Sequence, residues 1–201
     1  MKKILIASKN SGKIKEYSSL LNPLGFDVIS LLDLEVEDDV EEVGLTFLEN
    51  AMIKAASSAK KYNIPTIADD SGLMVDALDG APGIYSKRYS KDATDHSNNL
   101  LLIQNLKGKA NRHARFVCEI VYYDSQTGYL NFHGEVEGEI IDEMKGKKGF
   151  GYDPIFYIPA EGKTMAEIEL DRKNQISHRS IALHKCINAL KEIRNETSSV
   201  Q

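Results

Sequence analysis

The chain begins with a short apolar run, residues 3–7 (KILIA), that stops at a polar stretch and leads into an amphipathic segment. A run of this length predicts a buried strand, because a membrane span needs roughly 20 apolar residues. Ile14, Tyr17 and Leu21 then recur at helical spacing up to Pro23. A strand that leads directly into a helix favours an α/β fold from the start of the chain.

The segments that follow continue this alternation and end in a hairpin. Strands are expected at 26–31, 64–70, 114–124 and 129–141, and helices at 46–62, 94–108 and 177–193. Thr46 and Glu49 form a capping box at the start of the second helix. The order predicts a mixed sheet with helices on both sides, and we expect residues 1–201 to form a single domain.

Charge and cysteine content limit the classes of function. The net charge of −5, from 25 basic and 30 acidic residues, argues against a protein that coats nucleic acid. It leaves room for a local basic pocket that binds one small anion. Cys118 and Cys186 lie in apolar-periodic runs and predict buried free thiols rather than a disulfide or metal site. With no export signal or membrane span, a cytoplasmic protein is expected.

The polar stretch after the first strand carries Gly12 and Lys13, as a phosphate-binding P-loop does. However, Ala7 stands where the motif needs its first glycine, and Ile14 stands where it needs Ser or Thr. The P-loop is therefore excluded. The helix N-terminus from Asn10 to Lys13 still suits an anion site, although a solvent-facing lysine is the simpler alternative.

Acidic residues stand at two expected segment ends. Asp69 and Asp70 come directly after the strand residues TIA, and Glu41 and Glu42 lie in an acidic stretch. Adjacent carboxylates are costly unless a cation or hydrogen-bond donors neutralise them, and Mg²⁺ prefers such oxygen ligands. The alternatives are an Asx-turn at Asp69-Asp70 and a solvated loop at Glu41-Glu42.

Aromatic and basic residues mark the second half of the chain. Phe150 and Tyr152 stand among glycines in GFGYDPIF, which suits either stacking on a planar base or anchoring of a loop to the core. Lysines and polar residues that could face the same ligand or only water are Lys54, Lys87, Arg88, Lys173, Ser177, His178 and Arg179. Together these features predict a Mg²⁺-dependent nucleotide enzyme, without indicating which phosphate bond breaks.

At this level the chain resembles the inosine/xanthosine triphosphate pyrophosphatase family, from residue 4 to about residue 190. Ser8, Asn10, Lys13 and Glu16 match its N-terminal pattern [ST]-x-N-x-x-K-x-x-E. The segments that resemble its further blocks are EEVGLTFLENAMIKA, ADDSGLMVDALDGAPGIYSKRY, GFGYDPIF and ISHR.

The resemblance implies roles for individual residues. Asp70 is implied as general base and Mg²⁺ ligand, with Glu42 as the other main metal carboxylate and Asp69 in support. The residues implied to hold the triphosphate are Ser8, Lys9, Asn10, Ser11, Gly12, Lys13, Lys54 and Ser71, of which Lys13 and Lys54 are also implied in catalysis. Those implied to bind the base are Phe150, Gly151, Tyr152, Asp153, Lys173, His178 and Arg179.

The resemblance also implies a fold and an activity. The fold is an elongated mixed β-sheet flanked by helices, with two lobes and a central active-site cleft, in a homodimer. The activity is Mg²⁺-dependent hydrolysis of ITP, dITP and XTP to the monophosphate and pyrophosphate, which keeps these nucleotides out of DNA and RNA. Neither nucleic acid nor a membrane is an expected partner.

Three other functions compete with this one. A phosphotransferase or ATPase predicts a proper phosphate loop, which the sequence lacks. A nucleotide sensor without activity has no need for Glu42, Asp69 and Asp70 beside two phosphate lysines. A pyrophosphatase for pyrimidine or modified triphosphates is the nearest alternative, and only its substrates distinguish it.

Overall fold

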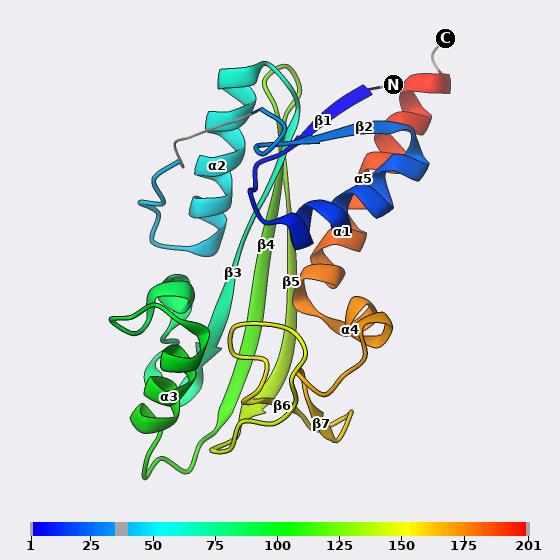
Figure 1. The fold of residues 1–201 in the computed structure, drawn as a ribbon. Helices are drawn as coiled ribbons and strands as arrows, with labels where there is room; N and C mark the ends of the chain where they lie inside the picture. The colour runs from blue at the N-terminus through cyan, green and yellow to red at the C-terminus, as the bar shows by residue number, and fades with distance from the viewer. Residues whose placement is uncertain (1, 35–39, 200–201) are drawn as a thin grey trace. The chain divides into compact units, whose positions relative to one another are not determined.

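The structure, a computed structural model, describes residues 2–34 and 40–199, with side chains up to residue 192. Its strands form one sheet in the order β2-β1-β3-β4-β5-β6-β7 (Figure 1). They are β1 (Lys2–Ile6), β2 (Phe26–Ser30), β3 (Thr66–Val75), β4 (His113–Asp124), β5 (Gly128–Ile140), β6 (Phe156–Ile158) and β7 (Lys163–Thr164). The sheet is mixed as predicted, because β1 pairs in parallel with β2 and β3, whereas β6 pairs antiparallel with β5 and β7.

The helices alternate with the early strands, which confirms the predicted α/β class. They are α1 (Ser11–Leu21), α2 (Phe47–Tyr62), α3 (Asp95–Asn105), α4 (Leu170–Ile176) and α5 (His178–Ser199), with 3₁₀ turns η1 (Asn22–Leu24), η2 (Asp76–Leu78) and η3 (Gly83–Arg88). Among the described helices, none is long and apolar enough to cross a membrane.

The chain divides into two compact units. Unit 1 comprises Met1–Asp70, Glu119–His133 and Ala182–Gln201, and unit 2 comprises Ser71–Cys118 and Gly134–Ile181. The division falls between Asp70 and Ser71, so the predicted site residues are shared out between the two units.

The core of unit 1 lies between α2 and the sheet. Leu5 of β1, Ala68 of β3 and the α2 residues Ala51 and Ala55 belong to one buried cluster. The predicted capping box is present, since Thr46 Oγ1 accepts from Glu49 N and the Glu49 carboxylate accepts from Thr46 N. Alanines on the buried face bring the α2 backbone close to the strands, so polar side chains of α2 can reach β3.

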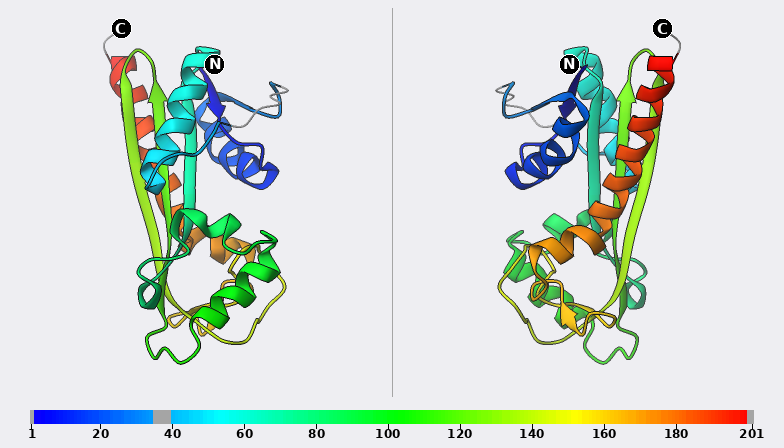
Figure 2. Two further views of the ribbon diagram at one scale, coloured as in Figure 1. Left: turned by 90° about the vertical axis from the view of Figure 1, so that its left-hand side faces the viewer. Right: turned by 90° about the vertical axis from the view of Figure 1, so that its right-hand side faces the viewer.

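The C-terminal helix completes unit 1. Figures 1 and 2 show α5 beside the β4–β5 hairpin, and Lys185 Nζ donates to the His133 carbonyl at 2.8 Å. Leu183 and Cys186 are fully buried on its apolar face. Cys118 and Cys186 are both buried free thiols, as predicted.

The core of unit 2 surrounds β4 and β6. Leu73, Leu102, Phe116 and Phe156 are members of its buried cluster, and the Phe116 and Phe156 ring centroids lie 4.5 Å apart. The loop of residues 141–155 lies beside α3, as Figure 2 shows. Polar bonds between this loop and α3 hold the glycine-rich segment that was predicted to meet the base.

The predicted end of the third strand at Asp70 is wrong. β3 continues to Val75, so Asp69 and Asp70 lie in the middle of a strand and form no Asx-turn. Ser71 and Gly72 have the composition of a turn, but Leu73 and Val75 continue the alternating apolar pattern and are fully buried. This correction changes where the two carboxylates point.

Candidate active site

The lysines predicted to hold the triphosphate and the carboxylates predicted to hold the metal lie within unit 1. Together with Asn50 they form what we call the carboxylate–lysine cluster, and its members are Lys13, Glu42, Asn50, Lys54, Asp69 and Asp70. They come from the start of α1, the segment before α2, the first turns of α2 and the middle of β3. Asn50 was not predicted from the sequence.

Asp69 and Asp70 point to opposite faces of β3, because side chains alternate along a strand. Ala68 packs in the core against α2, so Asp70, two residues on, lies on the same face. Asp69 lies on the other face, where its carboxylate accepts from Lys13 Nζ of α1 at 2.7 Å. The Asp69 side chain is only 2% exposed, so this ion pair is largely removed from water.

Asp70 receives donors from two turns of α2. Asn50 Nδ2 donates to Asp70 Oδ2 at 3.2 Å, and Lys54 Nζ lies 3.5 Å from Asp70 Oδ1. Lys54 also donates to Glu42 Oε1 at 2.8 Å. Burial raises the pKa of Asp70 against the opposing effect of Lys54. Burial alone would lower the pKa of Lys54, but the neighbouring carboxylates, Asp70 first, leave it raised.

The donor set fits Mg²⁺ bound together with a phosphate ligand. Oxygens of Glu42 and Asp70 already converge on one cation, the Lys54 ammonium. Among residues 2–34 and 40–199, no group of three or more His, Cys, Asp or Glu residues is arranged to hold a metal by itself. Mg²⁺ usually takes one or two carboxylates together with waters and substrate phosphates, so two convergent carboxylates are sufficient.

Near α1, residues that were predicted to bind the triphosphate form the N-terminal cap of this helix. Asn10 Oδ1 accepts from Gly12 N at 2.9 Å and from Lys13 N at 3.2 Å, and Ser8 Oγ accepts from Asn10 N at 3.1 Å. Asn10 therefore fixes the start of α1 and, with it, the base of the Lys13 side chain. Ser11 and Gly12 are exposed in the first turn, and Lys9 is half-buried just before it.

Four of the residues predicted to bind the base lie together in unit 2, beside Ser71, which was predicted to hold the triphosphate. We call this set the aromatic cluster, and its members are Ser71, Phe150, Asp153, Lys173 and Arg179. The Phe150 ring is 60% exposed, with Lys173 Nζ 5.5 Å and the Arg179 guanidinium carbon 5.9 Å from its centroid. Arg179 also donates to Ser71 Oγ at 3.2 Å. An exposed ring beside two cations offers a flat face on which a planar ligand can stack.

Asp153 organises the aromatic cluster. It is 5% exposed, accepts from Phe150 N at 2.9 Å and forms an ion pair with Lys173. Burial raises the pKa of Asp153, while Lys173 opposes the shift. Gly149 has φ +78°, and a Cβ there would lie 1.9 Å from Asp153 Oδ2, so only glycine fits this close approach.

Two residues that were predicted to bind the base, Tyr152 and His178, contact core residues of unit 2. The Tyr152 side chain belongs to the buried cluster of unit 2, and its hydroxyl donates to the Ser86 carbonyl at 2.8 Å. Tyr152 is therefore an anchor of the loop, which was the alternative interpretation of this segment. His178 begins α5 and stacks on Phe116 with ring centroids 4.9 Å apart.

The loop around Gly151 is held by residues that the sequence did not single out. Gly151 N donates to Asp95 Oδ2 at 2.7 Å, and Asn99 Nδ2 donates to the Gly151 carbonyl at 2.9 Å. Like Asn50, Asn99 is a buried amide on a helix. A polar residue at a helix position expected to face the core is the signal that could have found both.

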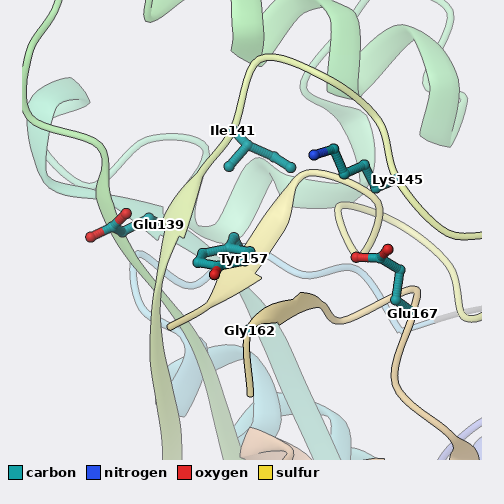
Figure 3. A pocket seen from close by; sticks show the side chains of 6 residues that line it. All are labelled: Glu139, Ile141, Lys145, Tyr157, Gly162 and Glu167. Atoms are coloured by element: carbon teal, nitrogen blue, oxygen red, sulfur yellow. The ribbon is translucent and has the colours of Figure 1, made fainter. Parts of the chain in front are cut away.

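A surface hollow elsewhere in unit 2 has a volume of about 380 Å³. Figure 3 shows the residues that line it around β6 and β7: Glu139, Ile141, Lys145, Tyr157, Gly162 and Glu167. None of them was predicted as a site residue, and acidic and basic groups both line the hollow. The candidate functional residues are therefore those of the carboxylate–lysine cluster in unit 1 and of the aromatic cluster in unit 2.

Comparison with known proteins identifies the family of this chain. The model of the Ham1 family matches residues 4–189. The chain belongs to the Ham1 family. The chain is 50% identical over 196 residues to a protein of Shigella flexneri named dITP/XTP pyrophosphatase, with 95% of this chain and 99% of the relative covered.

Solved structures of the family have the same fold. The Ham1 protein of Staphylococcus aureus matches with TM-score 0.90 and 44% identity, covering 95% of this chain and 99% of that one. A HAM1 protein of Coxiella burnetii matches with TM-score 0.91 and 43% identity, covering 96% and 100%. The resemblance stated from the sequence motifs is thus confirmed at the level of family and fold.

Proposed function

We propose that this protein hydrolyses deaminated purine nucleoside triphosphates (ITP, dITP and XTP) to the monophosphate and pyrophosphate, with Mg²⁺ as cofactor. The observation that carries the proposal is the convergence of Glu42 and Asp70 on Lys54, in a chain half identical to a protein named dITP/XTP pyrophosphatase. Paired carboxylates beside lysines suit a substrate that is itself a polyanion.

Asp70 acts as the general base in this proposal. It accepts a proton from the water that attacks the α-phosphorus in line with the leaving pyrophosphate. Burial raises the pKa of Asp70 and so strengthens it as a base, while Lys54 favours its ionised form. Lys13 and Lys54 offset the negative charge of the phosphates. Glu42 and Asp70 would hold Mg²⁺, which would supply further charge neutralisation at the phosphate oxygens. Asp69, predicted as a supporting ligand, lies on the other face of β3 and pairs with Lys13.

The aromatic cluster selects the base. The purine base of the substrate stacks on the Phe150 ring. Lys173, His178 and Arg179 supply donors for the 6-oxo group of hypoxanthine or xanthine. Adenine carries a donor at this position, so its amino group meets donors and leaves them unsatisfied. A site that hydrogen-bonds one substrate group can reject an analogue lacking it by about 10⁴-fold.

The protein is further proposed to act in the cytoplasm as a homodimer on free nucleotides. Its acidic net charge of −5 is consistent with a small-molecule substrate rather than nucleic acid. Light scattering coupled to size exclusion tests the dimer, for which the expected mass is twice that of the chain.

A substrate panel tests the function. The protein is incubated with Mg²⁺ and ITP, XTP, GTP, ATP or dUTP in water enriched in ¹⁸O, and the products are identified by mass spectrometry. We expect pyrophosphate and ¹⁸O-labelled IMP or XMP, with ATP nearly untouched. Omission of Mg²⁺ is expected to abolish turnover, and Mg²⁺ addition is expected to restore it.

Each alternative gives a different product. Release of orthophosphate and a nucleoside diphosphate contradicts attack at the α-phosphorus, and ¹⁸O in pyrophosphate places the attack at the β-phosphorus. Equal turnover of ATP contradicts selection by the 6-oxo group, and preferred turnover of dUTP favours a pyrimidine pyrophosphatase.

A further inference from the structure

Asn50 is a polar residue on the buried face of α2. Its neighbours on this face, Phe47, Ala51 and Ala55, are apolar or small and belong to the core, and Asn50 itself is 0% exposed. A buried amide is costly unless its donors and acceptor are satisfied, so the position of its partners explains why it is there.

The partners of Asn50 are two segments of the carboxylate–lysine cluster. Its Oδ1 accepts from Gly44 N at 2.9 Å, and its Nδ2 donates to Asp70 Oδ2 at 3.2 Å. This pairing fixes the orientation of the amide, because the reverse orientation would set Nδ2 against a backbone N–H and Oδ1 against a carboxylate. One side chain therefore connects β3 with the segment that carries Glu42.

The Glu42 segment is packed closely onto the start of α2. A Cβ on Gly44 would lie 2.7 Å from Asn50 Oδ1 and 2.7 Å from Glu49 Cβ, so no larger residue fits without displacement. The next backbone donors, Leu45 N and Thr46 N, both reach Glu49 Oε2, at 2.7 and 2.9 Å. The segment thus has a fixed path, and Glu42 lies only two residues before Gly44.

Asn50 and Lys54 hold different oxygens of Asp70. Lys54 faces Oδ1 and Asn50 donates to Oδ2, so the pair of donors fixes the rotation of the carboxylate. A bound triphosphate would compete for the Lys54 ammonium. Asn50 is neutral, buried and engaged with Gly44, so it would be left as the donor to Asp70.

We propose that Asn50 is a positioning residue that keeps Asp70 and the Glu42 segment in one arrangement for catalysis and metal binding. The proposal rests on the proposed function for its kinetic part. Its structural part, that Asn50 keeps two carboxylates convergent, concerns the metal-binding geometry of the protein without substrate.

The kinetic test replaces Asn50 in two ways. Asn50→Leu fills the core but removes both hydrogen bonds, and Asn50→Ala removes them and leaves space. Ser58→Ala is the matched control, because Ser58 is a buried polar residue of the same helix. We expect both Asn50 variants to lower kcat for ITP about 10- to 100-fold, with KM changed less than about 3-fold. Ser58→Ala is expected to match the wild type, and circular dichroism checks folding.

A double-mutant cycle separates positioning from general loss of structure. Because Asn50 acts through Asp70 as well as through the Glu42 segment, Asn50→Leu is expected to cause a smaller further loss in an Asp70→Asn background, measured under single-turnover conditions. The same fold-loss in both backgrounds overturns the proposal, as does a kcat within about 3-fold of wild type in both Asn50 variants.

Metal binding gives a readout that does not need activity. Mn²⁺ titration followed by electron paramagnetic resonance is expected to show at least about 5-fold weaker binding in Asn50→Leu and in Gly44→Ala. The Cβ of Gly44→Ala would meet Asn50 Oδ1 and so displaces the Glu42 segment, while the side chains that donate to Asp70 remain in the chain. Unchanged Mn²⁺ affinity in both variants overturns the proposal. If the wild type hydrolyses no triphosphate, the proposed function fails, and the Mn²⁺ titration still decides the role of Asn50.

Discussion

The carboxylate–lysine cluster and the aromatic cluster differ in the burial and the charge of their central groups. In the first, charged groups are largely buried, and Asp69, Asp70 and Glu42 each meet a lysine. In the second, the central group is a phenyl ring left 60% exposed beside two cations. Buried, paired charges hold a fixed geometry, whereas an exposed apolar face is stabilised when a ligand covers it.

Each cluster contains a buried aspartate that pairs with a lysine, but the two aspartates accept their further hydrogen bonds from different groups. Asp153 accepts from the backbone N–H of Phe150 and so holds a loop in place. Asp70 accepts from the side chain of Asn50, which leaves the backbone of β3 free to pair in the sheet. In the proposed function, the first cluster carries out the chemistry and the second recognises the base.

The largest expected effect is that of Asp70→Asn. Loss of the general base is expected to lower kcat for ITP about 10³-fold or more, with KM nearly unchanged, since the amide cannot accept the proton of water. Pyrophosphate release measures the effect. Asp142→Asn, which breaks a surface pair with Arg112, is the control and is expected to leave kcat unchanged. Retained turnover in Asp70→Asn would remove Asp70 from the role of base.

Lys13→Met is expected to lower kcat/KM for ITP about 10²-fold. The variant loses a positive charge that offsets the negative charge of the triphosphate, and it leaves the Asp69 carboxylate without its lysine partner. Lys15→Met on the same helix is the control, since Lys15 is exposed. If the two variants behave alike, Lys13 only balances the charge of Asp69 and does not act on the triphosphate. The proposed role of Lys13 in the carboxylate–lysine cluster is then contradicted.

Phe150→Ala is expected to lower kcat/KM for ITP about 30-fold, mostly through KM, because stacking contributes about 1–3 kcal/mol per base. Leu170→Ala, an exposed apolar residue of α4, is the control. A loss confined to kcat would contradict the assignment of the aromatic cluster to recognition.

The smallest effect concerns stability against pH. Burial raises the pKa of Asp153 above its ordinary 3.8, so just above pH 3.8 the folded protein keeps a proton that the unfolded chain has lost. Raising the pH through this window therefore lowers the free energy of unfolding. Asp153→Asn removes this dependence, and its Tm is expected to fall less between pH 4 and the raised pKa than that of the wild type. An unchanged Tm profile in Asp153→Asn would show that Lys173 cancels the effect of burial.

Local patterns in the sequence predicted much of the fold. The capping box at Thr46 and Glu49 fixes the start of α2 through neighbours in the chain, so it was recognisable without tertiary structure. The end of β3 was mispredicted, because Ser71 and Gly72 favour a turn locally and only burial of Leu73 and Val75 extends the strand. Tertiary packing outweighed turn propensity there.

The sequence predicted which residues belong to the candidate site better than it predicted where their side chains lie. The family motifs identified Lys13, Lys54 and Asp70, but placed Asp69 and Asp70 together, although the alternation of β3 separates their side chains. Asn50 was missed although it stands at a core-facing position of its helix, because the sequence does not identify the partners that satisfy a buried amide. Those partners are set by the fold, since Asp70 lies 20 positions further along the chain.

The division of labour between the clusters is tested most directly by the ratio of kcat/KM for ITP to that for ATP in two lysine variants. Lys54→Met is expected to slow both substrates alike and to leave the ratio unchanged, because Lys54 meets Glu42 and Asp70 of the carboxylate–lysine cluster. Lys173→Met is expected to lower the ratio at least about 10-fold, because one of the three proposed donors to the 6-oxo group is lost. A ratio that collapses in Lys54→Met and persists in Lys173→Met would contradict the account.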